Sequence, residues 1–529
     1  MKHKLTNHIK HTLLPCIAFS AVAGFCSAII ITAFKLLAEW VVHLSGMAYD
    51  FVRNDPIWLP LLILAAAAIG IISSLILERS HSCMGGGIPT SVAAIRGIVS
   101  FKWLASLILL PLSALLTFLA GLPLGTEGPC VQMGTAVGDG VAKCIGGGNY
   151  RGWRRYIMTG GAAAGFSIAT LSPISAIIFS MEELHKRFSP LLLTVASISV
   201  MTAQLTLQAL AALGIGSIEF FHISEIPGIP LHLYFAPIVI GLIAGGCSIL
   251  FTKLYHVIDK LMHAALKKAS TRIIFPIIFS ATALVGFFFA ESLGSGHSLV
   301  ESILTPGAAW YLLILIFLMR TLGMMVSNTA GTTGGIFLPT LAFGAIIGAL
   351  TASGMIALGL ISEEYYLLMV ILGIASFLGS TSRIPLTACV FAIEALAGIN
   401  NAIPIIIAIT IALLVVEASG CEDFTDTVIN AKTRKISKGK EAHTIEVELT
   451  VKEGAFAVGM DITNLLWPNS CVVVSFNRLD SSHGTSIISC GDKILVHYVT
   501  YTPRETAEEI TSLVGTQESG VLDAMIDEA

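Results

Sequence analysis

Charged residues are scarce in this sequence: they make up 12% of its 529 residues, against roughly 25% in an average soluble domain. Hydrophobic residues make up 55%. Apolar runs of about 20 residues, enough to cross a bilayer, recur along most of the chain, as in Leu13–Leu37, Ile57–Leu77 and Leu104–Leu124. This composition excludes a soluble globular fold and predicts an all-α protein that crosses the membrane many times.

Signatures of several other functions are missing. The sequence has no basic stripe with interleaved aromatic residues, which argues against nucleic acid as a partner. Its ten cysteines are scattered, without the paired spacing of a zinc site. It has no recognisable nucleophile–base pair or phosphate-binding loop. We therefore predict that the chain is not an enzyme and has no metal site and no cofactor.

Basic residues outside the apolar runs set the expected orientation, because cytoplasmic loops carry an excess of them. Lys2, Lys4 and Lys10 precede the first apolar run. A second group follows the last run: Lys432, Arg434, Lys435, Lys438 and Lys440. We expect both termini in the cytoplasm and the protein in the cell membrane, which is the inner membrane if the chain is bacterial.

The apolar part of the chain contains an internal repeat. Five residues of one stretch recur at identical spacings 210 positions later: Gly125, Glu127, Pro129, Gly134 and Gly138 match Gly335, Phe337, Pro339, Gly344 and Gly348. Five more recur 212 positions later: Gly161, Pro173, Phe179, Glu182 and Leu184 match Gly373, Pro385, Phe391, Glu394 and Leu396. Transporters built from repeats place the substrate between them, at corresponding segments broken by glycine and proline.

Three such broken segments, Met84–Pro89, Gly125–Pro129 and Gly334–Pro339, are predicted to begin helices inside the membrane. The free N–H groups and the dipole at a helix start favour an anion. Glu127 lies in the second segment, and a carboxylate inside a membrane is a functional candidate because it is costly to bury. There it can occupy the anion's position and leave it when protonated, so one residue would gate the anion and carry the proton.

The sequence GTEGPCVQ at Gly125–Gln132 resembles the G-[KR]-E-G-P-x-V-Q signature of the CLC family of chloride channels and chloride/proton antiporters. GGGIP at Gly85–Pro89 is similar to the family's G-S-G-I-P, and GIFLP at Gly335–Pro339 is similar to its G-x-F-x-P. The likeness covers roughly residues 12–430. It implies the CLC fold of two inverted repeats with broken helices, a homodimer, and one anion pathway in each subunit.

The resemblance also implies roles for individual residues. Glu127 matches the external gating glutamate, and Glu183 matches the internal proton-transfer glutamate of the antiporters. The residues alone leave another interpretation of Glu183 open, a solvated helix end paired with Lys186. Glu182 has a repeat partner in Glu394, which suggests that Glu182 is structural. The anion-binding residues that the resemblance implies are Gly86, Gly87, Ile88, Gly128, Ile336, Phe337 and Thr425.

The chain departs from the family pattern at three positions. Gly86 stands where the family has serine, and Thr126 stands where it has a basic residue before the glutamate. Thr425 falls at the expected tyrosine, or Phe424 does if the register slips by one. Each lost hydroxyl donor is worth about 0.5–1.5 kcal/mol. We expect chloride as the anion, with bicarbonate or nitrate as a hypothesis that the roomier site suggests.

The composition becomes polar near Gly420. Alternating apolar residues predict strands over His443–Val451, Ser470–Phe476 and Lys493–Val499, and Pro503–Val514 reads as a helix. The sequence therefore predicts a small α+β cytoplasmic domain. Its Glu446–Gly454 stretch and the GDKILV sequence at Gly491–Val496 resemble the C-terminal domain of potassium-uptake regulators. Whether this domain binds a small-molecule ligand stays open.

These patterns divide the chain into five parts. They are a cytoplasmic N-terminus over 1–11, a transmembrane domain over 12–430 with repeat halves near 12–215 and 230–430, a linker over 431–442, the α+β domain over 443–515 and an acidic tail over 516–529. We expect the chain to exchange a small inorganic anion for protons. A passive CLC-type anion channel is the first alternative, and a transporter-like sensor that signals through its C-terminal domain is the second.

Overall fold

The computed structural model describes residues 14–80, 83–85, 87–99, 101–145, 150–216, 220–221, 223, 226–396, 399–436, 443–453, 455–468, 471–477, 486–500 and 503–514. The predicted N-terminus 1–11, Gly86, residues 437–442 of the predicted linker and the tail 516–529 lie outside the described residues.

As far as residue 436, the described chain consists of helices and the loops that join them. The first half contains α2 (Leu14–Asn54), α3 (Leu59–Glu78), α4 (Ile88–Ile95), α5 (Trp103–Leu119), α6 (Glu127–Ile145), α7 (Tyr150–Thr170), α8 (Pro173–Phe179), a π-helical turn (Ser180–Leu184) and α9 (Pro190–Ala212). The second half contains α10 (Phe235–Lys268), α11 (Thr271–Phe288), α12 (His297–Ile303), α13 (Trp310–Ala330), α14 (Phe337–Ala357), α15 (Tyr366–Thr381), α16 (Pro385–Ala395) and α17 (Ala402–Ala418). The last helix before the polar region is α18 (Phe424–Ile436).

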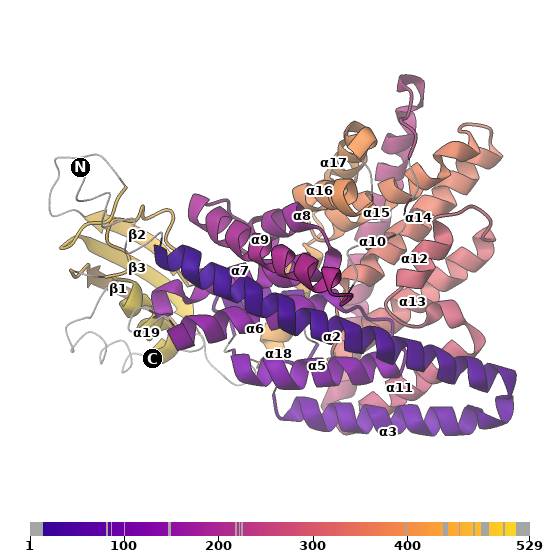
Figure 1. Cartoon of the computed structure of the whole chain (residues 1–529), viewed down its shortest axis with the longest axis horizontal. Helices are drawn as coiled ribbons and strands as arrows, with labels where there is room; N and C mark the ends of the chain where they lie inside the picture. The colour runs from indigo at the N-terminus through magenta and orange to yellow at the C-terminus, as the bar shows by residue number, and fades with distance from the viewer. Residues whose placement is uncertain are drawn as a thin grey trace.

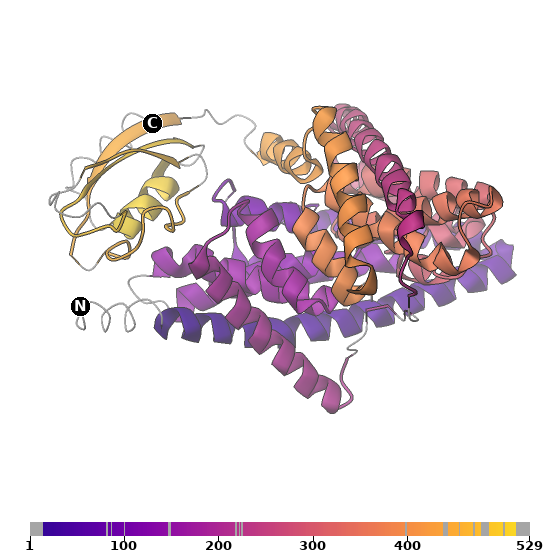
Figure 2. The same cartoon turned by 90° about the horizontal axis from the view of Figure 1, so that it is seen from above.

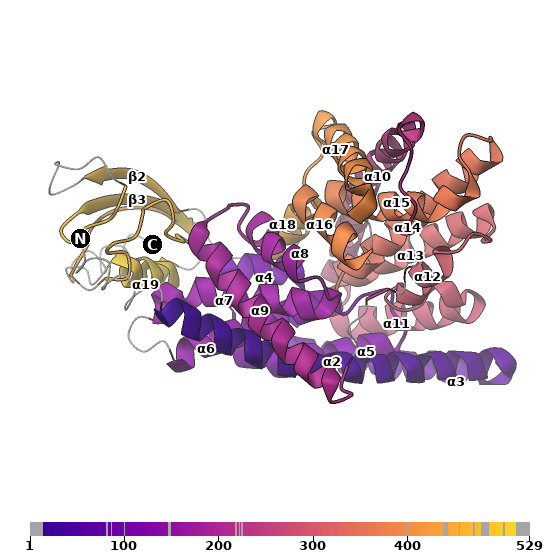
Figure 3. The same cartoon turned by 45° about the horizontal axis from the view of Figure 1, so that its top comes forward.

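Within the described residues, nine helices are long and apolar enough to cross a membrane, in agreement with the predicted multi-pass all-α fold. Helices α14 and α15 lie inside the bundle, with 72% and 83% of their apolar windows buried, whereas α3 has 22% buried. Leu61 and Leu64 of α3 are exposed. A helix that is apolar all round and exposed suits a lipid surface, and α3 lies along one edge of the molecule (Figures 1 and 3).

The two sequence repeats correspond to two helical hairpins, α6–α7 and α14–α15. Gly134 of α6 packs its main chain directly against Gly161 of α7, where a Cβ would overlap the carbonyl. In the second hairpin, a Cβ on Gly344 would lie 2.6 Å from the Cα of Ile374. The repeated glycines therefore let the two helices of each hairpin approach closely.

A three-stranded antiparallel sheet follows the helical part. It contains β1 (His443–Thr450), β2 (Cys471–Asn477) and β3 (Lys493–Thr500) in the order β1-β3-β2, and α19 (Pro503–Val514) packs against it. Val447 and Leu449 of β1 are buried, as the alternation predicts. The small α+β fold is thus confirmed. The predicted linker 431–442, however, overlaps α18, which continues to Ile436.

The sheet and α19 lie beside the N-terminal end of α7 (Figures 1 and 2). Arg155 of α7 donates to Glu509 of α19 at 2.5 Å. The ring of Phe456 packs edge-to-face on Trp153 at 5.0 Å and tilted on Tyr156 at 6.0 Å. The α+β part is therefore joined to a helix of the membrane part by an ion pair and an aromatic cluster.

Candidate functional site

The two repeat-related loops are joined by their main chains. Gly125 and Gly335 exchange two hydrogen bonds of 2.7 Å, in which each N–H donates to the other's carbonyl. Directly after this bridge, α6 begins at Glu127 and α14 begins at Phe337. The predicted helix starts therefore lie side by side, and their N-terminal ends form one electropositive region.

The loop before α4, which contains Gly87, meets the loops before α6 and α14 at Gly128. A Cβ on Gly128 would lie 2.6 Å from the Cα of Gly335 and 3.1 Å from the Cα of Gly87. Gly87 has a φ of 128°, which favours glycine, and its N–H donates to Oε1 of Gln132 at 2.7 Å. The helix that follows, α4, begins at Ile88. Three helix starts thus converge with no side chain between their main chains.

Glu127 is the first residue of α6 and lies between the bridge at Gly125 and the contact at Gly128. Its side chain is 1% exposed, and Thr126 donates its hydroxyl proton to Oε1 at 3.1 Å. The carboxylate also accepts from the N–H of Glu127 itself. Oε2 has no hydrogen-bond partner among the described residues, although buried carboxylate oxygens are normally paired. The carboxylate therefore lies over the start of its own helix, where an anion would be stabilised.

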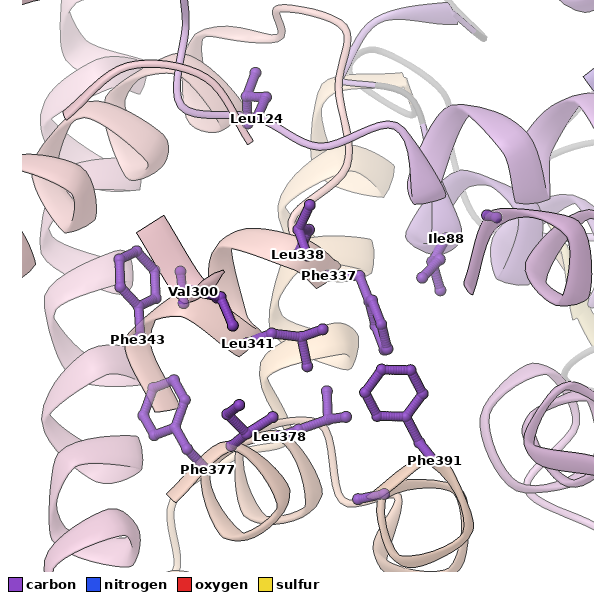
Figure 4. Packing of buried hydrophobic residues seen from close by; sticks show 14 of the residues in the cluster. Ile88, Leu124, Val300, Phe337, Leu338, Leu341, Phe343, Phe377, Leu378 and Phe391 are labelled. Carbon is purple, nitrogen blue, oxygen red and sulfur yellow. The ribbon is translucent and has the colours of Figure 1, made fainter. Parts of the chain in front are cut away.

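Phe337 and Ile88 line the apolar side of the same region. Phe337 points toward Phe391, with the two rings edge-to-face at 5.6 Å, and Ile88 lies on the neighbouring segment (Figure 4). Ile336 is the N-cap residue of α14 and is partly exposed. The structure thus brings Gly87, Ile88, Gly128, Ile336 and Phe337 to the helix starts around Glu127. Gly86 lies outside the described residues.

Glu183 lies on the π-helical turn that follows α8 and is 2% exposed. Arg96 clamps the turn by donating to the carbonyls of Glu183 at 2.8 Å and Leu184 at 2.9 Å. Oε2 of Glu183 has no partner among the described residues. The burial excludes the solvated helix end that the residues alone left open, and a buried carboxyl with one unpaired oxygen is a candidate for proton transfer.

Thr425 hydrogen-bonds to Glu183 through its side chain. Its N–H donates to Oδ1 of Asp423 at 2.9 Å, and Asp423 accepts from Lys186 at 2.7 Å. Phe424 instead packs its ring on Tyr255 at 4.9 Å and is buried. Thr425 is therefore a hydrogen-bond partner of Glu183, and Phe424 belongs to the aromatic core.

Two residues of these arrangements were missed by sequence reasoning. Gln132 is part of the GTEGPCVQ motif, and that motif was the available signal for its bond to Gly87. Arg96 carries no such signal, because its partners, two carbonyls and the carboxylate of Asp426, lie more than 80 positions away. Both residues position main-chain segments that carry the candidate groups.

The model of the family described as voltage-gated chloride channel matches residues 69–417. The chain belongs to this CLC family. Among its curated relatives are the H(+)/Cl(-) exchange transporter ClcA of Klebsiella pneumoniae, 25% identical over 80% of this chain and 90% of the relative, and that of Citrobacter koseri, 26% identical over 79% and 89%.

Solved CLC structures have the same fold. A slow cyanobacterial Cl-/H+ antiporter superposes with a TM-score of 0.72 at 21% identity, covering 80% of this chain and 98% of that one. A CLC-type fluoride/proton antiporter gives 0.64 at 21% identity, over 77% and 96%. The chain is therefore a multi-pass membrane protein with the CLC architecture.

Proposed function

We propose that the chain exchanges a small inorganic anion, chloride by default, for protons. The observation that carries this proposal is the position of Glu127: a buried carboxylate with an unpaired oxygen at the point where three glycine loops meet. When ionised, it occupies the place where an anion would bind. Once protonated it no longer competes for the N–H groups, so the anion enters and a proton is carried with the same movement.

Glu183 is the proposed second proton station. A chain of ring contacts leads toward it: Phe337 meets Phe166 edge-to-face at 5.1 Å, and Phe166 stacks on Phe179 at 4.3 Å. Phe179 directly precedes the turn that carries Glu183. Phenyl rings hold no titratable proton, so we propose that water carries it along this route. The curated relatives named above are H(+)/Cl(-) exchangers, which supports exchange over a passive channel.

The test uses purified protein in liposomes with a chloride gradient and a pH-sensitive dye inside. The wild-type chain should move protons uphill as chloride runs down its gradient. Glu127→Gln should keep chloride flux and lose coupling, whereas Glu183→Gln should lose proton movement alone. If chloride flowed without moving protons in the wild-type chain, the protein would be a channel. If both variants coupled normally, the two roles would be wrong.

The identity of the anion belongs to the same proposal. Thr425 bonds to Glu183, and Gly86 and Gly87 offer no side-chain donor. Main-chain N–H groups would then supply most of the contacts to the bound anion. Such contacts suit chloride and leave bicarbonate and nitrate as candidates. An anion panel in the same liposomes decides: strong exclusion of both larger anions would reject that hypothesis.

We further propose a homodimer with one pathway in each subunit, located in the bacterial inner membrane with both termini in the cytoplasm. In this proposal residues 443–515 form a separate cytoplasmic domain after the transmembrane part, and the chain is a transporter without enzymatic activity. The contact of Arg155 with Glu509 supports a regulatory role for that domain. Deleting residues 440–529 separates the functions, because flux that survives deletion assigns transport to the membrane part.

A further inference from the structure

Lys35 places a positive charge in the middle of the apolar helix α2. It is half-buried, and its Nζ donates to the carbonyls of Ile168 at 3.1 Å and Ala169 at 3.4 Å, near the end of α7. Its hydrogen-bond partners in the described part of the chain are these neutral carbonyls, and Glu39, one turn further along α2, is exposed and forms no ion pair with it. A cation inside a membrane helix is costly and marks a functional position by default.

The register of α6 against α7 places Glu127 beside the carbonyls that Lys35 binds. Gly134 of α6 packs against Gly161 of α7. Cys130, which lies four residues earlier on α6, packs against Gly165, which lies four residues later on α7. The helices therefore run antiparallel in step. Three residues further in the same direction, Glu127 lies opposite Ile168, whose carbonyl accepts from Lys35.

The second repeat has the same arrangement without the charges. Gly344 packs against Gly373 and Gly348 against Met369, so the register puts Phe337 opposite Ser380. At Ser380, α10 supplies Ser248, whose hydroxyl bonds Ser380 at 2.7 Å and Thr381 at 2.9 Å. Ser380 and Thr381 are the repeat counterparts of Ile168 and Ala169, each 212 positions later.

The two repeats differ at two positions that lie near each other in the fold. Where the first repeat has Glu127, the second has Phe337, and where the first has Lys35, the second has Ser248. The neutral hydroxyl is enough to join α10 to α15. In the first repeat Ile168 and Ala169 have no side-chain hydroxyl, and Lys35 binds their carbonyls instead. The cation thus occurs in the repeat that carries the carboxylate.

We infer that Lys35 is a positioning residue that stabilises the ionised form of Glu127 and attracts the anion to the same place. The inference rests on the proposed function of Glu127. A permanent positive charge close to a carboxylate favours its ionised state, so Lys35 sets the external pH at which the anion path opens. It also raises the local concentration of the anion.

Other groups act on Glu127 and must be separated from Lys35. His297 of α12 is the second basic residue within electrostatic range, and Cys130 lies one turn along α6. The ring of His297 contacts the carbonyl of Phe220 at 2.7 Å and the carboxylate of Glu301 at 3.6 Å. Because His297 is a second basic group near Glu127, the pH dependence is compared in the wild-type and the His297→Gln backgrounds.

The experiment measures chloride flux in liposomes against external pH and against chloride concentration. Lys35→Gln keeps donors for the two carbonyls and removes the charge. It should move the midpoint of the pH dependence upward by about one pH unit and raise the half-saturating chloride concentration several-fold. Lys35→Arg should retain both values, and Ser248→Ala, the matched change in the second repeat, should leave the midpoint unchanged.

A relocated charge provides the rescue. Thr126→Lys restores a cation beside Glu127 and should bring the Lys35→Gln midpoint back toward wild type. If Lys35→Gln does not assemble, Thr126→Lys alone carries the test and should move the midpoint downward. An unchanged midpoint in these variants would overturn the inference. If Lys35→Gln lowered the melting temperature and left the midpoint unchanged, Lys35 would only cap the end of α7. Glu127→Gln separates the two claims: pH dependence that persists in that variant contradicts the proposed function itself.

Discussion

Glu182 and Glu394 cap each other's helices. Glu182 accepts from the N–H groups of Leu386 at 3.0 Å and Thr387 at 2.7 Å, at the start of α16. Glu394 accepts from Ile174 at 2.9 Å and Ser175 at 2.8 Å, at the start of α8. Every one of these positions is related to its counterpart by 212 residues. The two halves therefore interlock by two reciprocal pairs of charge-assisted hydrogen bonds.

This reciprocity distinguishes Glu182 from its neighbour Glu183. We expect Glu182→Gln and Glu394→Gln to lower stability by similar amounts, about 1–2 kcal/mol each, because hydrogen bonds to charged groups are worth roughly 1.5–3 kcal/mol and glutamine retains part of them. Thermal unfolding in detergent measures the loss, and proton coupling in liposomes should persist in both. Loss of coupling in Glu182→Gln with normal stability would contradict the structural assignment.

The convergence at Gly128 has no room for a methyl group. Gly128→Ala would place a Cβ 2.6 Å from the Cα of Gly335. We expect it to force the loops apart, with about 1–3 kcal/mol lost to overpacking and anion flux reduced by an order of magnitude or more. Gly354→Ala in α14 is the matched control, because its Cβ would meet nothing within 4 Å. Equal flux in the two variants would show that the loops can separate without loss of function.

Much of this site could be predicted because glycine and proline act locally. They break the helices at the positions where α4, α6 and α14 begin, and the repeat supplies the pairing of Gly125 with Gly335. The partners of Lys35 and Thr425 could not be predicted. Lys35 meets Ile168 through the packing of α2 on α7, and Thr425 meets Glu183 across more than 200 residues, so only the tertiary register decides these contacts.

The contact between the α+β part and α7 should hold the two parts together. Gly152 lies under the ring of Phe456, and a Cβ there would approach ring carbons at 2.5 Å. Gly152→Val should therefore separate the α+β part from α7. Gly246→Ala in α10, where a Cβ would meet nothing within 4 Å, is the matched control away from this contact. Protease cleavage after residue 436 should become faster in Gly152→Val alone. Unchanged cleavage would show that the contact contributes little.

Thiol labelling tests the fold of the same region. Burial raises the pKa of the Cys471 thiol to about 12, so about one thiol in 10⁴ is ionised at pH 8, and the thiolate is the reactive form. Cys490 is exposed and serves as the internal comparison. Peptide mass spectrometry after maleimide treatment at pH 8 should find Cys490 modified long before Cys471, and the difference should vanish in denaturant. Equal rates in the native protein would contradict the described packing of β2.

Thr425 is one of the positions where the chain departs from the family pattern. Substitutions there distinguish a hydrogen-bond partner of Glu183 from an anion ligand. Thr425→Val removes the hydroxyl that bonds Glu183 and keeps the side-chain volume, whereas Thr425→Ser keeps the hydroxyl. A hydroxyl that donates to a carboxylate stabilises its ionised form, so the valine variant should shift the internal pH dependence of proton movement upward and leave the order of anion preference unchanged. The serine variant should behave as wild type. If the valine variant instead altered anion preference and left proton movement alone, Thr425 would be an anion ligand, as the sequence comparison alone implies.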